Sequence, residues 1–467
     1  MVRKEITVED VIELCGGRLL CGDLDTQLND FCIDTRKLKY GDVYVGIKGE
    51  NVDGNTLYEQ ALKEGASVCI LEGIEILEDV IYKYSDRSII IVEDTIKALQ
   101  KLASYKRNMY EIPVVAVTGS VGKTSTKDII SSVMSKEFNV LKTEGNYNSQ
   151  IGLALTVLRL RDHGAMIVEI GMNHLGEISK LSEIVKPTVA VITNVGTAHI
   201  GILGSRANIL KAKLEILDGL QSDGKVIINN DNDLLHEWYL NSGSKYDVIT
   251  FGMENVSDVM AYNTQINENG STYNVDIESK KYDVNVGVGG NHFILNSLCA
   301  IAVGRLFNIP MNSILDGVLN FELTKRRMQV EKKANDIIII NDCYNANYDS
   351  MKGAIEYLGK LPTGKKIAVL GDMLELGEYS ESFHRKVGEE IVKNNIDILI
   401  TVGKESKYIV EEAEKLGMNE ENIYQFKSNQ EAERKLGELM ADGRVNVLLK
   451  ASNGMKFQEI FEAIMKI

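Results

Sequence analysis

Residues 114–128 read VVAVTGSVGKTSTKD, and this stretch decides the fold of the middle of the chain. An apolar run ends at Thr118, a glycine-rich turn follows, and Lys123 and Thr124 open a helical pattern. The backbone N–H groups of such a turn and of the helix N-terminus after it bind phosphate oxygens. We therefore predict a strand, a phosphate-binding turn and a helix, and with them a site for ATP or GTP.

The chemistry of the turn follows from its side chains. Lys123 is expected to reach the β- and γ-phosphates, and the Thr124 hydroxyl to ligate Mg²⁺. The general pattern has another glycine where this chain has Val117, so the turn has the shortened form T-G-x-x-G-K-T. A chance Gly-Lys-Thr at a helix start is the alternative, but the strand, turn and helix signals occur in the required order. The predicted nucleotide contacts here are Gly119, Ser120, Gly122, Lys123, Thr124 and Ser125.

Outward from this turn, continuous apolar runs alternate with helical segments. Runs that are apolar on both faces suit buried parallel strands. Such runs occupy residues 165–170, 189–195 and 225–229. The polar, alternating stretch 247–288 predicts an antiparallel excursion, and a helix is expected over 292–307.

Two further segments flank this central one. From about residue 327 the alternation starts again, with strands expected at 337–341, 366–370, 396–402, 423–426 and 445–449. The first 110 residues mix short strands, at 42–47, 67–71 and 88–92, with helices such as 55–64. We expect an α/β protein of three domains: residues 1–110, a central parallel-sheet ATP-binding domain over 111–325, and a Rossmann-like domain over 326–467.

Composition excludes several classes of protein. The net charge of −15 argues against a nucleic-acid partner, because phosphate backbones need a basic surface. No run approaches the roughly 20 apolar residues that span a bilayer, and residues 1–9 lack the apolar core of a secretory signal, so a cytoplasmic protein is expected. The six cysteines show neither C-x-x-C nor metal-ligand spacing, so we expect reduced, mostly buried thiols.

Polar side chains follow the predicted central strands. Glu169 ends one run, and His199 follows the next in TNVGTAHIG; Asn146 and Asn148 lie in TEGNYNSQIG. Active sites of α/β proteins lie beyond the carboxyl ends of parallel strands. Each residue alone could be structural, a satisfied histidine or a loop cap. The positions of Glu169 and His199 relative to Thr124 favour a metal site instead.

Taken in order, these pieces resemble the Mur ligase family. They are TGSVGKTSTK, GNYNSQIG, VEIGMNHLGEI, TNVGTAHI, AKLEIL, a Gly-x-His helix start and a late Asp, and the similarity covers nearly the whole chain. Members join an amino group to a carboxylate through an acyl phosphate, using ATP and two Mg²⁺ ions. The resemblance therefore implies an ATP-dependent ligase.

The resemblance also implies roles for single residues. Lys123 and Thr124 would hold phosphate and the first metal, Glu169 would bridge both metals, and His199 would ligate the second. Lys213, in KAKLEIL, matches a lysine that the family carbamylates, since an ammonium has no lone pair to offer a metal. Outside the family context, Lys213 would be read as an exposed helix lysine.

Three further positions match nucleotide contacts of the family. Asn296 and Arg327 fall where members contact adenine or ribose and the ATP phosphates, and Asp342 falls on the acidic position of the domain that closes on the nucleotide. An arginine delivered by domain closure neutralises phosphate charge only once substrates are in place.

The outer segments resemble the member of the family that adds D-alanyl-D-alanine to UDP-N-acetylmuramoyl-tripeptide. The matching stretches are 34–55, 341–351 and 369–378. The implied UDP-sugar contacts are Thr35, Arg36 and Lys48, and the implied substrate contacts elsewhere are Asn146, Asn148, Asn345, Asn347, Asp372 and Glu375. A monomer is expected.

The chain departs from the family pattern at several positions and leaves alternatives open. The departures are Asn55, Ser149, Phe293, Cys343, Tyr348 and residues 450–455. A folylpolyglutamate synthase-like ligase shares the central machinery but lacks the pattern of the first 110 residues. A P-loop regulatory NTPase would need neither a carbamylatable lysine nor a third domain that binds dipeptide. An inactive family member used as a scaffold is a further alternative, and the retained Lys123, Glu169, His199 and Lys213 argue against it.

Overall fold

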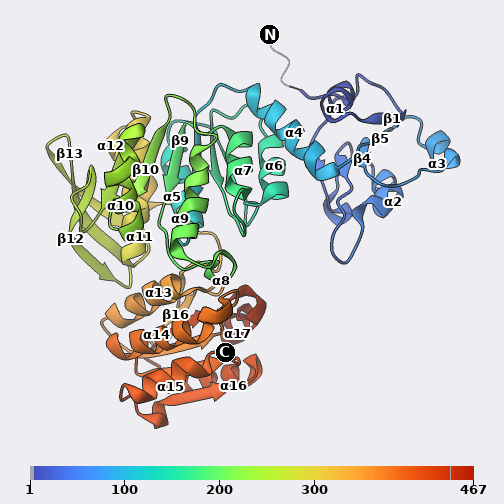
Figure 1. Cartoon of the computed structure of the whole chain (residues 1–467). Helices are drawn as coiled ribbons and strands as arrows, with labels where there is room; N and C mark the ends of the chain where they lie inside the picture. Colours follow the sequence, from blue (N-terminus) through green and yellow to red (C-terminus); the bar gives the residue numbers. More distant parts are fainter. Residues whose placement is uncertain (1–4, 442, 467) are drawn as a thin grey trace.

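Three β-sheets, each flanked by helices, form the protein (Figure 1). The computed structural model describes residues 5–441 and 443–466; residues 1–4, part of the charged amino terminus noted above, lie outside the described residues. The three-domain α/β fold predicted from the sequence is confirmed. No helix in the described part of the chain combines the length and apolar character needed to cross a bilayer.

The first sheet has the strand order β1-β5-β4-β3-β2. Its strands are β1 (Arg18–Cys21), β2 (Phe31–Cys32), β3 (Val43–Val45), β4 (Val68–Leu71) and β5 (Ser88–Ile91), and its helices are α1 (Val8–Cys15), α2 (Tyr58–Lys63) and α3 (Glu78–Lys83). Strands β2 to β5 are parallel and β1 is antiparallel. The three predicted strands are present, whereas the short edge strands β1 and β2 carried too little pattern to be predicted.

Helix α4 (Thr95–Asn108) joins the first domain to the second. Asp94 caps it by accepting from the Lys97 N–H, which satisfies one of the free donors of its first turn. At its other end Arg107 is buried, and its Nε donates to the Val185 carbonyl at 2.7 Å. This buried arginine ties the connection to the central domain.

The central sheet has nine strands in the order β14-β13-β12-β11-β10-β9-β6-β8-β7. They are β6 (Val114–Thr118), β7 (Val140–Lys142), β8 (Ala165–Glu169), β9 (Val189–Ile192), β10 (Lys225–Asn229), β11 (Asp247–Gly252), β12 (Val259–Asn267), β13 (Gly270–Ile277) and β14 (Lys280–Val286). The antiparallel excursion predicted over 247–288 is wrong in its first part. Strand β11 pairs in parallel with β10, and antiparallel pairing begins only between β12 and β13.

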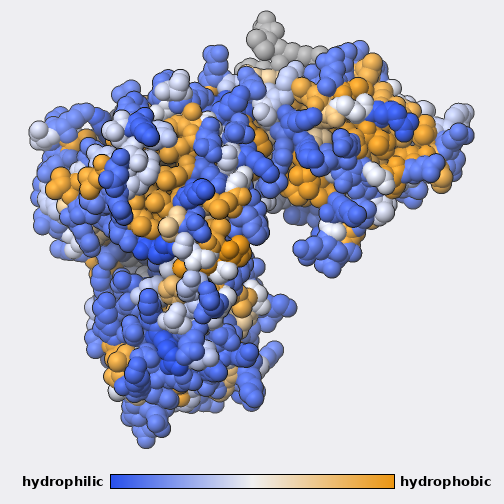
Figure 2. Space-filling model, in the orientation of Figure 1, coloured by the Kyte–Doolittle hydropathy of each residue, from blue (hydrophilic) through white to orange (hydrophobic). Residues whose placement is uncertain are grey.

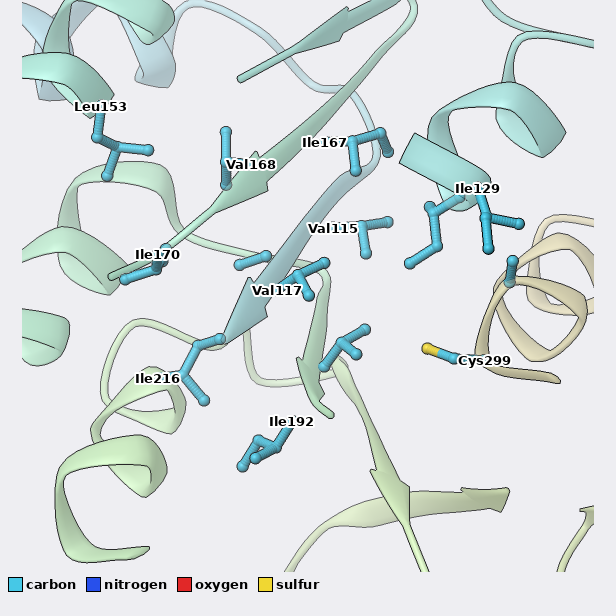
Figure 3. Close-up of a cluster of buried hydrophobic side chains, with 14 of the residues drawn as sticks. Val115, Val117, Ile129, Leu153, Ile167, Val168, Ile170, Ile192, Ile216 and Cys299 are labelled. Carbon is cyan, nitrogen blue, oxygen red and sulfur yellow. The ribbon is translucent and has the colours of Figure 1, made fainter. Parts of the chain in front are cut away.

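Helices cover both faces of this sheet. They are α5 (Lys123–Met134), α6 (Gln150–Leu158), α7 (Glu177–Val185), α8 (Ile200–Leu203), α9 (Arg206–Leu214), α10 (Asp233–Ser242), α11 (Asn291–Leu306) and α12 (Met311–Leu319). Figure 3 shows the core between them, where Val115 and Val117 of β6 lie beside Ile167 of β8 and near Cys299 of α11. All six cysteines are free; three are buried and three half-buried.

The third sheet has the order β15-β16-β20-β17-β18-β19, parallel except for β15. Its strands are β15 (Gln329–Lys333), β16 (Ile337–Asn341), β17 (Lys365–Gly371), β18 (Ile398–Val402), β19 (Ile423–Phe426) and β20 (Val445–Lys450). Helices α13 (Tyr348–Lys360), α14 (Ser380–Lys393), α15 (Lys407–Lys415), α16 (Asn429–Met440) and α17 (Gln458–Ile464) complete it. The alternation of strand and helix matches the Rossmann-like prediction.

The third domain lies against the central one (Figure 1). Thr197 donates its N–H and hydroxyl to the Asp349 carboxylate at 2.6 and 2.8 Å, and the Tyr379 hydroxyl donates to the Gly204 carbonyl at 2.7 Å. The face drawn in Figure 2 is mostly hydrophilic on the third domain and more apolar on the first. Hydrogen bonds from the segment 197–204 of the central domain to Asp349 of α13 and to Tyr379 make up this part of the contact between the two domains.

Candidate active site

The site begins where three adjacent central strands end. Val117 of β6 is the register partner of Glu169 of β8, and Thr118 is the partner of Ile192 of β9. Because parallel strands end at one edge of a sheet, the turn after Thr118, the Glu169 side chain and the residues after Ile192 are neighbours. The sheet topology thus brings together groups that lie up to about 80 residues apart in sequence.

The segment after β9 holds the phosphate turn in shape. Gly119 has φ 150°, and a Cβ there would lie 1.9 Å from the Thr193 hydroxyl, so only glycine fits. The side-chain oxygen of Asn194 accepts from the N–H groups of Ser120 and Val121 at 3.0 and 2.9 Å. The supporting roles of Thr193 and Asn194, which begin TNVGTAHIG, were not predicted from the sequence. Their place directly after a buried strand was the available signal.

The predicted phosphate and metal residues lie close together beside the turn. The Lys123 ammonium donates to the Gly119 carbonyl at 2.8 Å, and burial lowers its pKa. The two Glu169 oxygens accept from the Thr124 hydroxyl at 2.8 Å and from the Asn148 amide at 2.7 Å. The structure therefore groups Thr124, Asn148 and Glu169 beside Lys123. Asn146 is exposed.

His199 and Lys213 are both desolvated. Burial, aided by the charges of Lys123 and Lys213, lowers the pKa of His199 to about 4, so its imidazole is neutral at physiological pH. Lys213 is 1% exposed, and burial is the main reason that its pKa lies well below the ordinary value. In the part of the chain that the structure describes, no carboxylate lies within 4.0 Å of its amine. The reading of Lys213 as an exposed helix lysine is wrong.

The side chains around the phosphate turn supply too few oxygen ligands to hold Mg²⁺ by themselves. No three of the described His, Cys, Asp and Glu side chains converge on one point. Mg²⁺ prefers oxygen ligands, and the site offers the Thr124 hydroxyl and the Glu169 carboxylate beside the His199 imidazole. A carbamate on the buried Lys213 would add the missing anionic oxygens. The donor set therefore fits a metal site that includes a modified lysine.

A pocket opens between the phosphate turn and the third domain. Its lining includes Ser120, Gly122, Thr124, Ser125, His292, Phe293, Arg327, Asp342, Asn347 and Lys450. Asn296 lies just behind it: a Cβ on Gly122 would be 3.0 Å from its oxygen, and its buried amide nitrogen has no partner among the described residues. Phe293 packs on the His292 ring at 4.5 Å. His292, which the sequence reasoning used only as a helix-start marker, lines this pocket.

The third domain contributes a cation and an acid to this pocket. The Arg327 guanidinium lies 3.8 Å from the Tyr344 ring centre, and one of its nitrogens is 3.5 Å from the Thr124 hydroxyl. Asp342 accepts from the Met328 N–H at 3.1 Å and forms an ion pair with buried Lys450. Tyr344 and Lys450 were not predicted. They show that Arg327 and Asp342 are held by their own domain.

A buried carboxylate on α5 accepts hydrogen bonds from the linker between the central and third domains, three residues before Arg327. Asp128 is 2% exposed, and one of its oxygens accepts from the Thr324 N–H at 3.1 Å and hydroxyl at 2.8 Å. Helix α5 also begins with Lys123, so one helix positions the phosphate turn and the linker together. The Asp128–Thr324 contact is therefore a candidate for the element that aligns Arg327.

Thr324→Val removes one of these two hydrogen bonds and retains the backbone one. We expect the KM for ATP to rise several-fold and the melting temperature to fall by a few degrees, since a hydrogen bond to a charged group contributes about 1.5–3 kcal/mol. Steady-state kinetics and calorimetry measure both. Thr363→Val, at an exposed threonine of the third domain, is the control. An unchanged KM for ATP would contradict an aligning role.

The remaining predicted residues lie in the first and third domains. Thr35, Arg36 and Lys48 belong to the first domain and line neither of the two pockets described here; Arg36 pairs with Asp34 at 2.8 Å. Asn347 caps α13 by accepting from the Ser350 N–H at 2.9 Å.

Asp372 and Glu375, predicted as substrate contacts, both face groups of the protein itself. The Asp372 carboxylate accepts from the N–H groups of Lys404, Glu405 and Ser406, so its oxygens are occupied inside the third domain. Glu375 faces His199 instead, with Oε2 3.3 Å from Nδ1.

A second cleft meets the first pocket at the phosphate turn. It is lined on one side by Asn148, Ser149, Glu169 and Glu177, from the central domain, and on the other by Tyr344. Lys123, His199, Arg327 and Asn345 line both cavities. A ligand in each cavity would therefore meet the other at these four side chains.

Known proteins match the whole chain. Three family models match it: one described as "Mur ligase family, catalytic domain" over residues 30–107, the Mur ligase middle domain over 117–304, and "Mur ligase, glutamate ligase domain" over 326–453. A Bacillus subtilis protein named UDP-N-acetylmuramoyl-tripeptide–D-alanyl-D-alanine ligase is 35% identical over 98% of both chains.

Solved structures agree with these sequence matches. A crystal structure of MurF from Acinetobacter baumannii has a TM-score of 0.89 at 28% identity and covers 99% of both chains. The ADP complex of MurF ligase from Thermotoga maritima has a TM-score of 0.81 at 26% identity, covering 94% of this chain and 97% of that one. With one sheet per matched segment and the phosphate turn at the start of the second, the chain belongs to the Mur ligase family.

Proposed function

We propose that this protein joins D-alanyl-D-alanine to UDP-N-acetylmuramoyl-tripeptide while ATP is cleaved to ADP and phosphate. The observation that carries the proposal is the junction of two cavities at Lys123, His199, Arg327 and Asn345. One cavity opens on the phosphate turn, as a nucleotide requires, and the other opens beside Asn148 and Glu169. The full-length relatives that bear this activity in their names support the choice of substrates.

The first step brings two anions together. A terminal carboxylate oxygen of the tripeptide attacks the γ-phosphorus, the bond to the β-phosphate oxygen breaks, and ADP leaves. Lys123 and Arg327 offset the repulsion between carboxylate and triphosphate. Mg²⁺ at Thr124, Glu169 and His199 would neutralise the remaining phosphate charge.

The second step forms the amide. The neutral dipeptide amine attacks the carbonyl carbon of the acyl phosphate, and the tetrahedral intermediate expels phosphate as the nitrogen loses its proton. Asn345 lies at the junction where the amine has to arrive. Asn347 and Asp372 would act by holding the loops around it, since both are occupied by backbone N–H groups.

The outer parts of the site complete the proposal. Thr35, Arg36 and Lys48 of the first domain are proposed to hold the UDP-sugar end of the substrate, and Asn296 the adenosine end of ATP. A carbamate on Lys213, formed from carbon dioxide and the neutral amine, would help hold two Mg²⁺ ions. We propose that the protein works as a monomer in the cytoplasm.

Phosphate release tests the reaction directly. The full chain is incubated with ATP, Mg²⁺ and UDP-N-acetylmuramoyl-tripeptide, carrying either lysine or diaminopimelate, with and without D-alanyl-D-alanine. We expect release that depends on the dipeptide. Release that needs neither substrate would favour a regulatory NTPase, and no release under any condition would favour the inactive scaffold.

A further inference from the structure

Glu375 and His199 face each other across the contact between the third and central domains. Glu375 Oε2 lies 3.3 Å from His199 Nδ1. That nitrogen is buried and has no aligned hydrogen-bond partner among the described residues. A buried ring nitrogen normally finds a partner, and the carboxylate of the exposed Glu375 side chain is the acidic group that lies within reach of this one.

The backbone is strained on both sides of this contact. His199 has φ 62° and Glu375 has φ 66°, the left-handed region that residues other than glycine rarely adopt. Such conformations persist where the surrounding structure enforces them, and they cluster at functional sites. Because both residues of this facing pair have such a backbone, we infer that their loops set the directions of the two side chains.

The loop that carries Glu375 is held at each preceding residue. Asp372 accepts from three backbone N–H groups, as described above. The Met373 N–H donates to His384 Nε2 at 3.0 Å, and the Leu374 N–H donates to the Ser452 hydroxyl at 2.9 Å. These hydrogen bonds set the path of the loop, so Glu375 is presented at a defined place.

The two domains also approach closely beside this pair. A Cβ on Gly201 of α8 would lie 2.5 Å from the Glu375 carbonyl oxygen, so the backbones are in direct contact there. The Tyr379–Gly204 hydrogen bond lies one helical turn further on. The position of Glu375 relative to His199 is therefore a result of the docking of the third domain.

We propose that Glu375 is a positioning residue that accepts a hydrogen bond from His199 Nδ1 and leaves Nε2 free to ligate the metal ion. The inference rests on the proposed metal-dependent ligase. Metal-binding histidines usually donate their other ring N–H to such an acceptor, which sets the tautomer and the ring orientation. Glu375 then belongs to the metal site rather than to the dipeptide site, and the metal site is complete only when the third domain has docked.

Mn²⁺ in place of Mg²⁺ gives a readout that does not depend on turnover. The full chain with bound ADP is titrated with Mn²⁺, and free Mn²⁺ is measured by electron paramagnetic resonance. Loss of such outer partners typically weakens metal affinity about 10–100-fold, and we expect this for Glu375→Ala. Glu375→Gln should lose less, because its neutral amide oxygen still accepts, though more weakly than a carboxylate. Glu378→Gln, three residues further along the chain and exposed, is the matched control and should bind as the unmodified protein does.

Three outcomes would overturn this assignment. They are unchanged Mn²⁺ affinity in Glu375→Ala, unchanged affinity in Glu375→Gln if the alanine variant does not fold, and a raised KM for D-alanyl-D-alanine with Mn²⁺ binding intact. The last result would show that Glu375 contacts the dipeptide rather than supporting the metal site. Failure of the unmodified protein to bind Mn²⁺ with ADP would count against the proposed function itself, and thermal melting of each variant checks the fold.

Discussion

Lys123→Ala is expected to lower kcat about 10²–10³-fold, a loss of about 2.7–4 kcal/mol of transition-state stabilisation, as when one preorganised donor is removed. Lys123 lies half-buried at the junction of the two cavities, and its ammonium donates to the Gly119 carbonyl of the same turn. A desolvated charge already held in place interacts more strongly with developing phosphate charge than one in water. Dipeptide-dependent phosphate release measures the effect.

The fold should tolerate this change, so the loss can be assigned to chemistry. Burial lowers the pKa of Lys123, which means that the protein holds its charged form at a cost, and alanine removes that cost. We expect an unchanged or slightly raised melting temperature. Lys123→Arg should restore little, because a planar guanidinium does not place its donors where the compact ammonium does. Lys180→Ala, at an exposed position of α7, is the control. Near-normal turnover in Lys123→Ala would remove the basis for the ligase.

Lys213→Ala is expected to reduce turnover at least as strongly, and a small carboxylic acid should restore part of it. Lys213 is 1% exposed, and its pKa is well below the ordinary value because burial disfavours the ammonium. A neutral amine is the form that reacts with carbon dioxide, and the product carries the anionic oxygens that the metal donors lack. Acetate or formate can enter the space left by the side chain and supply a carboxylate there.

The modification itself can be observed apart from activity. Protein equilibrated with ¹³C-labelled carbon dioxide should show a carbamate carbonyl resonance that is lost in Lys213→Ala and kept in Lys211→Ala, at an exposed lysine of the same helix. Because its pKa is lowered, the Lys213 amine stays neutral to lower pH than a surface lysine, so the resonance should persist as pH falls through the ordinary lysine range. Absence of both the resonance and the rescue would count against the carbamate.

Local patterns in the sequence were sufficient for most of the fold. The strand, turn and helix over 114–134 could be predicted because the apolar run, the glycines and the Lys-Thr pair are contiguous, and their conformations follow from local backbone preferences. The error at β11 has the opposite origin. A strand that alternates in polarity can pair in either direction. Packing, rather than the polarity pattern of β11, decides that β11 pairs in parallel with β10.

The sequence by itself determined the phosphate turn and most of the alternating strands, and it located Glu169 and His199 after predicted strands, because each of these features depends on residues that are adjacent in the chain. Only the tertiary structure decided that Lys213 is buried, that Asn194 supports the turn, and that Glu375 faces a histidine of another domain. Burial and pairing across sheets and domains depend on which surfaces meet. A local pattern cannot predict this, because residues such as His199 and Glu375, which are 176 positions apart, meet only when the domains pack together.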